Sequence, residues 1–320
     1  MILAEKLAQN TPHIDMLCHM KNVLITGGAG FVGKHLQSVL LNSNSSIGKY
    51  NLEIFDLKLG HDIRDYEQVR NVIDRFQPDL IFHLAAQAFV PEGNTNPQRV
   101  FSVNVEGTLN VLEAVKQTGN HSRILIAGTS EEYGYDRDDN ELTENSSTNP
   151  STPYGVSKLA ATTLSMTYAR NYQMNIVATR AWNHIGTGAS PSYAVSAFAK
   201  RIAEAEKYGT VVKHGNLESI RNYTDVKDII EGYIRIIDCE SGIYNIAGEN
   251  SVSAKVVLEM LASFASKSIR FEANDNLYRP MSLKFPNPNC TKLKSLTGWK
   301  QKISLEATLR EVLEDWRLKI

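Results

Sequence analysis

The segment NVLITGGAGFVGKHLQSVLLN, residues 22–42, constrains the fold more than any other part of the chain. It begins with an aliphatic run, passes through a turn that carries Gly27, Gly30 and Gly33, and continues with apolar residues at helical spacing. Glycine permits a tight turn, a close approach of the backbone to a ligand, and close packing of the helix on the strand. The free N–H groups that open such a helix attract phosphate groups. The segment therefore predicts a strand–turn–helix unit that holds the pyrophosphate of a dinucleotide.

An acidic residue at the end of the second predicted strand supports this interpretation. The Asp56 carboxylate can accept hydrogen bonds from both hydroxyls of an adenosine ribose and would repel a 2′-phosphate, which favours NAD over NADP. Lys58 leaves NADP open, because a cation can accommodate the phosphate. Asp62 is placed either to meet the adenine amino group or to cap the next helix. The residues predicted to contact this part of the cofactor are Gly27, Gly30, Phe31, Val32, Gly33, Asp56, Asp62 and Ile63.

Predicted strands and helices alternate through the first half of the chain. This alternation indicates right-handed βαβ units and a parallel sheet that is covered on both faces. The predicted fold class is α/β: a Rossmann-type, doubly wound parallel sheet with a smaller, mostly helical C-terminal lobe for the substrate. Strands are predicted at 22–26, 51–57, 79–86, 123–130 and 174–186, and helices at 66–76, 101–119 and 152–172.

The pattern changes after residue 183. Residues 190–209 predict one amphipathic helix, whereas 220–237 and 242–248 indicate a return of the chain to the sheet. The first 19 residues lack the basic and apolar regions of a signal peptide, and we interpret them as an appended segment or as sequence before a start near Met20. The expected organisation is an N-terminal extension at 1–19, a dinucleotide-binding domain at 20–182 with a return at about 222–247, and a nucleotide-sugar-binding lobe at 183–221 and 248–320.

Composition narrows the class of function. Of the 320 residues, 42% are hydrophobic and 22% are charged, and the formal net charge is −1, so nucleic acid or an anionic membrane is not expected as a main partner. No apolar run reaches the roughly 18 residues that a membrane span requires. Cys18, Cys239 and Cys290 are too few and too far apart for a disulfide framework or a thiolate zinc site. We expect a cytoplasmic protein without a bound metal.

Tyr154 and Lys158 form the pattern Tyr-x-x-x-Lys, which places both side chains on one face of a helix. An ammonium group one turn away, together with an oxidised nicotinamide, would lower the pKa of the phenol and make it a usable acid or base. The lysine can also hold the nicotinamide ribose. Thr129, at the end of the fourth predicted strand, can hydrogen-bond the reacting oxygen. Together these groups describe redox chemistry between an alcohol and a ketone.

The chain resembles the extended short-chain dehydrogenase/reductases over residues 21–320, through the motifs TGGAGFVG, DIRD, HLAAQ, NVEGTLNVLEA, TSEEYG, YGVSK and RNYTDV. The resemblance implies a Rossmann domain with a nicotinamide cofactor, a C-terminal lobe that binds a nucleotide sugar, and a homodimer formed through helices near 104–118 and 154–171. It assigns Thr129, Tyr154 and Lys158 as the catalytic triad. It also places the backbone of Leu84, Ala85 and Ala86 and the side chain of Asn104 along the cofactor.

Within this family the chain is most similar to GDP-4-dehydro-6-deoxy-D-mannose reductases, notably in RAWNHIGTGASPSYAVSAFAKRIAEAE and GNLESIRNYTDVKDI. A diphosphate favours planar bidentate donors, which agrees with a role for the two arginines of this set. His184 is interpreted as a structural residue beside the site. The residues that the resemblance turns toward the substrate are Ser130, Glu131, Asn183, Lys200, Arg221 and Arg279.

The two glutamates of TSEEYG leave two reactions open. In the related GDP-mannose 4,6-dehydratases, a glutamate at the position of Glu131 removes the C5 proton so that water can leave from C6, yet the reductases carry the same glutamate. Glu132 is interpreted as outward or structural. The exit loop NHIGTGASP resembles that of the reductases. The leading hypothesis is therefore reduction of the C4 ketone of a GDP-linked 4-keto-6-deoxy sugar, and the alternative is a dehydratase or epimerase.

Three departures from the reductase pattern predict an altered fit to the sugar. Ala88 replaces a common serine, the segment after Arg279 lacks its usual acidic residue, and Trp182 stands where another aromatic residue is common. The sugar could therefore be another GDP-linked hexulose, and the product the rhamno, talo or another epimer. A third hypothesis, a dinucleotide sensor without catalytic activity, is disfavoured because Tyr154, Lys158 and Thr129 are all retained.

Overall fold

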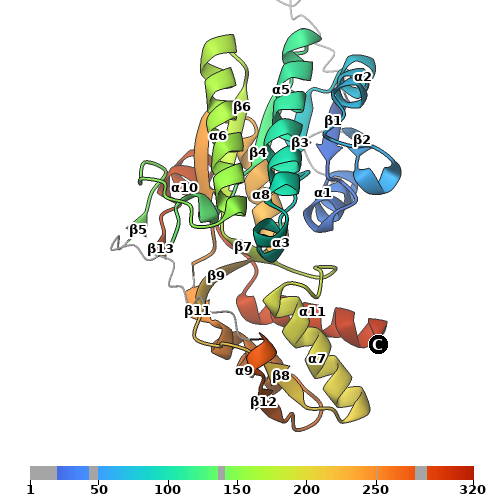
Figure 1. Ribbon diagram of the computed structural model, residues 1–320, viewed down its shortest axis with the longest axis vertical. Coiled ribbons are helices and arrows are strands. Elements are labelled where there is room, and N and C mark those ends of the chain that lie inside the picture. Colours follow the sequence, from blue (N-terminus) through green and yellow to red (C-terminus); the bar gives the residue numbers. More distant parts are fainter. Residues whose placement is uncertain (1–19, 43–49, 136–140, 250, 278–286) are drawn as a thin grey trace, which may run out of the picture.

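The computed structural model describes residues 20–42, 50–135, 141–249, 251–277 and 287–320. The predicted extension at 1–19 and the candidate Arg279 lie outside these ranges. The centre of the described chain is a six-stranded parallel sheet in the order β10-β6-β4-β3-β1-β2 (Figure 1), so the predicted α/β class is confirmed. Its strands are β1 (Lys21–Thr26), β2 (Tyr50–Phe55), β3 (Leu80–His83), β4 (Arg123–Ala127), β6 (Ile176–Ala181) and β10 (Gly242–Ile246).

Helices cover both faces of this sheet. Successive residues of a strand face opposite sides, so Val23 and Ile25 of β1 enter one hydrophobic cluster and Leu24 enters the other. Burial on both faces explains why the strands read as continuous apolar runs rather than as alternating ones. One face carries α1 (Phe31–Asn42), α8 (Val226–Ile236) and α10 (Thr291–Thr297), and the other carries α2 (Tyr66–Phe76), α5 (Gly107–Gln117) and α6 (Pro153–Tyr172).

The strand order reverses between β1 and β3. The chain runs outward from β1 to β2 at one edge, and then returns to place β3 on the other side of β1. The loops that leave the carboxyl ends of β1 and β3 consequently diverge, and a crevice opens between them. Ligands of open α/β sheets bind at this kind of switch point.

The helix predicted at 101–119 is interrupted. It consists of α4 (Pro97–Phe101), the π-helical turn η2 (Ser102–Glu106) and α5. The side chain of Asn104, in this turn, points inward and is hydrogen-bonded to Gln87 and Ser157. The backbone carbonyl of Asn104 accepts a hydrogen bond from the Thr108 hydroxyl. A π-turn inside a helix is frequent at functional sites. The helix predicted at 190–209 is shorter than expected and forms α7 (Ala194–Tyr208).

The chain returns to the sheet later than the sequence indicates. The segment from residue 220 was expected to rejoin the sheet, but β9 (Ile220–Asp225) pairs instead with β7 (Asn183–Ile185) and β11 (Ser251–Ser253). The return consists of α8, which packs on the sheet, and β10, which extends the edge beside β6. Strand pairing depends on which edge is free, and this information is not present in the local apolar pattern.

A third hydrophobic cluster lies below the sheet, in the lower body of Figure 1. It is formed mainly by α7, α9 (Ala254–Ser263) and α11 (Leu305–Lys319), with β8 (Val212–His214) and β12 (Phe271–Ala273) paired at its side. Among the described residues, the structure contains no helix with the length and apolar character needed to cross a lipid bilayer. The remaining short elements are η1 (Leu57–Leu59), α3 (Val90–Thr95), η3 (Ser130–Glu132), β5 (Glu141–Leu142), η4 (Asp275–Leu277) and β13 (Asn287–Pro288).

An ion pair between Glu206 of α7 and Arg317 of α11 ties this lower body together. The Arg317 guanidinium donates to both carboxylate oxygens at 2.6 and 2.8 Å, and the backbone N–H of Ser266 donates at 2.6 Å. The bond from Arg317 is the main reason that the pKa of Glu206 falls to about 2, from an ordinary value of 4.5. The charged form is therefore stabilised in the folded state.

We expect Glu206→Gln to reduce the free energy of unfolding by about 3 kcal/mol at pH 7, in proportion to this lowering of the pKa. Because the folded-state pKa is depressed, the stabilisation is complete above about pH 4.5 and is lost as the pH falls toward 2. Urea unfolding of both proteins at pH 7 and pH 3 measures this. The difference should shrink to less than half at pH 3, and an equal difference at both values would contradict the assignment.

Candidate active site

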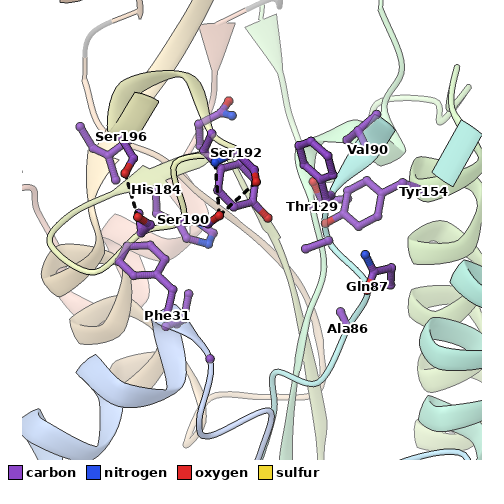
Figure 2. Close-up of a pocket in the computed structure, with 18 of the residues that line it drawn as sticks. Phe31, Ala86, Gln87, Val90, Thr129, Tyr154, His184, Ser190, Ser192 and Ser196 are labelled. Carbon is purple, nitrogen blue, oxygen red and sulfur yellow. Dashed lines mark hydrogen bonds between the residues drawn. The ribbon is translucent and has the colours of Figure 1, made fainter. Parts of the chain in front are cut away.

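A cavity of about 1060 Å³ opens at the carboxyl ends of the central strands, at the point where the strand order reverses. Its walls come from the glycine turn after β1, the loops after β2, β3, β4 and β6, and the start of α7. Figure 2 shows Thr129 and Tyr154 on one side, near Ala86 and Gln87. Phe31, His184, Ser190 and Ser192 lie across the cavity from them.

The glycine turn forms the floor of the cavity. Gly27 has φ +72°, and a Cβ atom there would lie 2.6 Å from the backbone nitrogen of Ala85. A Cβ atom on Gly33 would lie 2.5 Å from the backbone of Gly28, because the first turn of α1 packs directly on the loop. These contacts leave room only for glycine and bring the amide groups of the turn to the cavity wall. Gly27, Gly30, Phe31, Val32 and Gly33 all line the cavity, as do Leu84, Ala85 and Ala86.

The Gly27→Ala variant is expected to weaken binding of a nicotinamide dinucleotide by about tenfold or more. The added methyl group must displace the Ala85 backbone, and a positive φ costs a non-glycine residue about 1–3 kcal/mol. Fluorescence titration with NADH and NADPH gives the affinity. Gly119→Ala is the matched control, because Gly119 has φ +64° but no atom within 4 Å of its Cβ position. Equal losses of affinity in the two variants would show that strain alone is responsible.

Asp56 joins the end of β2 to the glycine turn. One carboxylate oxygen accepts a hydrogen bond from the Ala29 N–H at 2.9 Å, and the other accepts from the Lys58 N–H at 2.9 Å. The carboxylate also lines the cavity, so its negative charge faces any ligand in the turn. Lys58 lines the same region and could partly offset that charge.

Asp62 and Ile63 also line the cavity. Asp62 forms an ion pair with Arg64 at 2.5 Å, and this hydrogen bond is the main reason that the pKa of Asp62 lies below its ordinary value. The alternative role as a helix cap is wrong, because Asp65 caps α2 by accepting from the Gln68 N–H at 3.2 Å. Asp62 therefore keeps a carboxylate at the cavity wall.

Thr129 and Tyr154 meet at the centre of the cavity. Thr129 ends the loop after β4, and Tyr154 lies in the first turn of α6, where Thr152 caps the helix by accepting from the Gly155 N–H at 3.0 Å. A Cβ atom on Gly155 would lie 2.8 Å from the Glu131 carbonyl oxygen, so glycine allows α6 to lie directly on this loop. Thr129 and Tyr154 therefore lie close together at the cavity wall, and Thr129 lowers the pKa of the Tyr154 phenol.

The protein environment holds Tyr154 in its protonated form. Burial and the nearby Glu131 carboxylate raise the pKa of the phenol, and the hydrogen bond with Thr129 lowers it only in part. The prediction of a lowered pKa invoked Lys158 together with a nicotinamide, whereas the protein's own groups have the opposite net effect. A raised pKa suits a residue that must carry a proton at neutral pH and release it to a developing alkoxide.

Lys158, one helical turn after Tyr154, is buried and is not among the described residues that line the cavity. Burial lowers its pKa to about 8, and the Glu132 carboxylate opposes this change. His83 is also buried here, between the hydroxyls of Thr26 (2.8 Å) and Thr108 (3.0 Å). Burial, and then the charge of Lys158, lower the pKa of His83 to about 3, so the imidazole is neutral.

Asn104 is not among the described residues that line the cavity, contrary to the predicted contact with the cofactor. It is 1% exposed and binds the backbone of Gln87 from below, accepting from the Gln87 N–H at 2.8 Å. Its amide also donates to the Ser157 hydroxyl at 2.9 Å. Because η2 turns this side chain inward, Asn104 supports the loop that follows β3 and the first turn of α6.

Glu132 points into the core and not outward. Its carboxylate accepts from the Thr129 N–H at 3.1 Å, from the Thr162 hydroxyl at 3.0 Å and from the Arg180 guanidinium at 2.9 Å. The Arg180 guanidinium also stacks on the Tyr133 ring, 4.5 Å from its centroid. One carboxylate thereby connects the loop after β4 with α6 and β6. Of the two roles expected for Glu132, outward or structural, the structural role is confirmed.

At the far end of the cavity, the structure brings together Ser130, Glu131, Asn183 and Arg221. Lys200 does not reach the cavity within the described chain: its ammonium group pairs with Glu204 at 3.6 Å and faces the Trp316 ring. Arg201, the next residue of α7, lines the cavity in its place. One residue turns a helix by 100°, and sequence similarity alone did not fix which side chain faces inward.

Sequence reasoning missed several aromatic and hydroxyl residues that line the cavity. Phe89 and Tyr193 meet edge to face with ring centroids 6.0 Å apart, so the loop after β3 contacts the start of α7. Ser190 and Ser192 line the cavity near His184 (Figure 2). The serine- and proline-rich stretch before α7 was the available signal. His184 also lines the cavity, and its imidazole bonds to the Trp182 carbonyl at 3.0 Å.

Comparisons with known proteins agree with this geometry. The chain is 27% identical over 305 residues to the GDP-6-deoxy-D-mannose reductase of Pseudomonas aeruginosa, a match that covers 94% of this chain and 98% of the relative. The structure of RMD from Pseudomonas aeruginosa complexed with NADPH has a TM-score of 0.85, at 27% identity, and covers 94% of this chain and 100% of that one. The Thermus thermophilus UDP-glucose 4-epimerase complex with NAD has a TM-score of 0.83, also at 27% identity, with 93% and 100% covered.

The fold, the cavity lined by Thr129 and Tyr154, and the buried Lys158 one helical turn after Tyr154 define an extended short-chain dehydrogenase/reductase, a class of nucleotide-sugar epimerases, dehydratases and reductases. The chain belongs to the family described as GDP-mannose 4,6 dehydratase, whose model matches residues 24–312.

Proposed function

We propose that this protein reduces the C4 ketone of a GDP-linked 4-keto-6-deoxy hexose, GDP-4-dehydro-6-deoxy-D-mannose, to an alcohol. A bound NADH or NADPH supplies the hydride. Tyr154 gives its phenolic proton to the ketone oxygen as the oxygen becomes an alkoxide, and Thr129 hydrogen-bonds the same oxygen. The buried ammonium group of Lys158 favours the phenolate that Tyr154 then becomes.

One observation carries this proposal. Thr129 and Tyr154 line the same cavity as the glycine turn, Thr129 is close enough to affect the pKa of the phenol, and burial keeps the phenol protonated. A proton donor is thus present where a dinucleotide and a second ligand can meet. The similarity to a GDP-6-deoxy-D-mannose reductase over nearly the whole chain supports the choice of reaction and of sugar nucleotide.

The lobe end of the cavity suits a sugar diphosphate. Arg221 and Arg201 line it, and a guanidinium group can bind a phosphate through two parallel hydrogen bonds. Glu131 lines the same cavity and is close enough to interact electrostatically with both Arg221 and Tyr154; Ser130 and Asn183 also line the cavity, and we place the hexose along these residues. We assign these five residues to the substrate, together with Arg279 by resemblance alone, and we withdraw Lys200.

The cofactor is proposed to be NAD or NADP, with NAD favoured by the carboxylate of Asp56 beside the glycine turn. Known structures that support a nicotinamide dinucleotide include complexes with NADPH and with NAD.

A homodimer through α5 and α6 is proposed as well, because Leu109, Val156 and Tyr172 are exposed on these two neighbouring helices. The proposed division into a dinucleotide-binding domain and a lobe, and a cytoplasmic location, follow the same family resemblance.

A dehydratase or epimerase is the second candidate, and the position of Glu131 favours it. This glutamate lines the cavity, and burial raises the pKa of its carboxyl, so the carboxylate is a stronger base than usual. Such a base could remove the proton from C5, which is adjacent to the C4 ketone.

Absorbance at 340 nm separates the two candidates. The purified protein is mixed with GDP-4-dehydro-6-deoxy-D-mannose and with NADH or NADPH in separate cuvettes. A stoichiometric fall in absorbance is expected for the reductase, and NMR of the product gives the configuration at C4. If absorbance stays constant while GDP-mannose becomes a 4-keto sugar without added reductant, the protein is a dehydratase instead.

A further inference from the structure

The phenol of Tyr135 donates a hydrogen bond to the Glu131 carboxylate, at Oε2. Glu131 lines the cavity, whereas Tyr135 lies behind it and is not among the described lining residues. The chain reverses between them at Gly134, which has φ +80° and a Cβ position only 1.9 Å from the Asn149 carbonyl oxygen. This glycine turn sets the phenol against the carboxylate.

Charged and phenolic groups surround the Glu131 carboxylate. The Arg221 guanidinium, from β9, lies 5.9 Å from the centroid of the Tyr135 ring, and its charge lowers the pKa of both Glu131 and Tyr135. Tyr154, from α6, is close enough for the Glu131 charge to raise its pKa. Burial, and then Glu131, raise the pKa of Tyr135, so its phenol remains a neutral hydrogen-bond donor at physiological pH.

The hydrogen bond leaves the two carboxylate oxygens unequal. Oε2 accepts from Tyr135, while the described residues offer no hydrogen-bond donor to Oε1. A hydrogen bond to the charged form of a carboxylate stabilises that form and makes it a weaker base, and the bond from Tyr135 lowers the pKa of Glu131 accordingly. It also fixes the plane of the carboxylate relative to Tyr154.

We propose that Tyr135 is a positioning residue for Glu131, which holds one carboxylate oxygen and so limits the use of the other as a base toward C5 of the bound sugar. The inference rests on the proposed function, because it concerns the sugar that the same cavity binds. It explains how a chain that carries a potential elimination base can act as a reductase: Tyr135 makes Glu131 a weaker base than burial alone would make it, and holds one of its oxygens.

The step that Tyr135 limits is proton transfer without net redox change. Glu131 Oε1 takes the C5 proton, the C5–H electron pair forms a C4–C5 double bond, and the C4 oxygen becomes an enolate oxygen that the Tyr154 hydroxyl hydrogen-bonds. Return of a proton from the Glu131 carboxyl to C5 regenerates the ketone. In D₂O the carboxyl exchanges its proton with solvent, so the returned atom is deuterium.

The test is deuterium incorporation at C5 of GDP-4-dehydro-6-deoxy-D-mannose in D₂O, followed by NMR, with NAD⁺ or NADP⁺ present and no reductant. Tyr135→Phe should exchange C5 at least about tenfold faster than the unmodified protein, the effect expected for loss of a hydrogen bond to a charged group. The double variant Tyr135→Phe with Glu131→Gln should return to the background rate. A general loosening of the structure would slow exchange and not accelerate it.

Tyr168→Phe is the matched control, because Tyr168 also donates its phenol to a glutamate, Glu113, away from the cavity. It should exchange C5 at the unmodified rate. The inference is overturned if Tyr135→Phe does not accelerate exchange, or if acceleration persists in the double variant. The proposed reductase is judged separately, by the 340 nm assay of the unmodified protein, so failure of one does not imply failure of the other.

Discussion

The Tyr154→Phe variant is expected to reduce the ketone about 10²- to 10⁴-fold more slowly than the unmodified protein, and to bind NADH or NADPH with an unchanged dissociation constant. Phenylalanine keeps the ring and removes only the hydroxyl, and loss of a positioned proton donor has an effect of this size. The glycine turn and Asp56, which face the cofactor, are untouched. Initial rates at 340 nm and fluorescence titration of the cofactor measure the two quantities.

The Tyr168→Phe variant is the control for this prediction, because it removes a phenol from the same helix at a position outside the cavity wall. Its turnover should match that of the unmodified protein. Unchanged turnover in Tyr154→Phe would refute the role of Tyr154 as proton donor. A parallel loss of cofactor affinity would mean that the substitution disturbs the dinucleotide site and that the kinetic effect has another origin.

The second large effect is expected for stability and not for rate. Replacing Glu132 by alanine should lower the free energy of unfolding by about 3–5 kcal/mol, because the buried guanidinium of Arg180 loses its counter-charge. The Thr129 N–H and the Thr162 hydroxyl lose their acceptor at the same time. Urea unfolding at neutral pH, followed by tryptophan fluorescence, gives the difference.

Glu53→Ala provides the comparison. Glu53 pairs with Arg75 at 2.6 Å, but the Arg75 side chain is 67% exposed, and pairs of this kind contribute about 0–1 kcal/mol. If Glu132→Ala costs no more than Glu53→Ala, the buried carboxylate does not hold the loop, α6 and β6 together. The two variants thus separate an interior ion pair from a surface pair at equal chemical change.

The parts of the site that the sequence predicted are those fixed by local rules. Gly27, Gly30 and Gly33 follow a strand and open a helix, and at Gly27 and Gly33 only glycine fits the backbone contacts. Tyr154 and Lys158 are four residues apart, so they share one face of the helix that residues 153–172 form. In such cases spacing along the chain determines position in space, and the predicted residues lie around one cavity or directly beneath it.

The parts that the sequence did not predict depend on contacts between distant segments. Nothing in the residues around Asn104 shows that a π-turn directs this side chain away from the cavity. The choice between Lys200 and Arg201 depends on how α7 is rotated against its neighbours. β9 pairs with β7 and β11 because the edge of the central sheet beside β6 is taken by β10. Each outcome required the packed structure.

Glu131 lines the cavity whereas Glu132 is buried in the core, and this difference limits how an enzyme of this kind can change its reaction. A change at Glu131 alters what the cavity does and leaves the fold intact, whereas a change at Glu132 removes the support of three elements at once. Evolution of a new reaction is therefore free to replace residue 131 but not residue 132. A one-residue insertion or deletion between Thr129 and Glu132 would shift Glu132 away from Arg180 and Thr162, so this stretch is constrained in length as well as at residue 132.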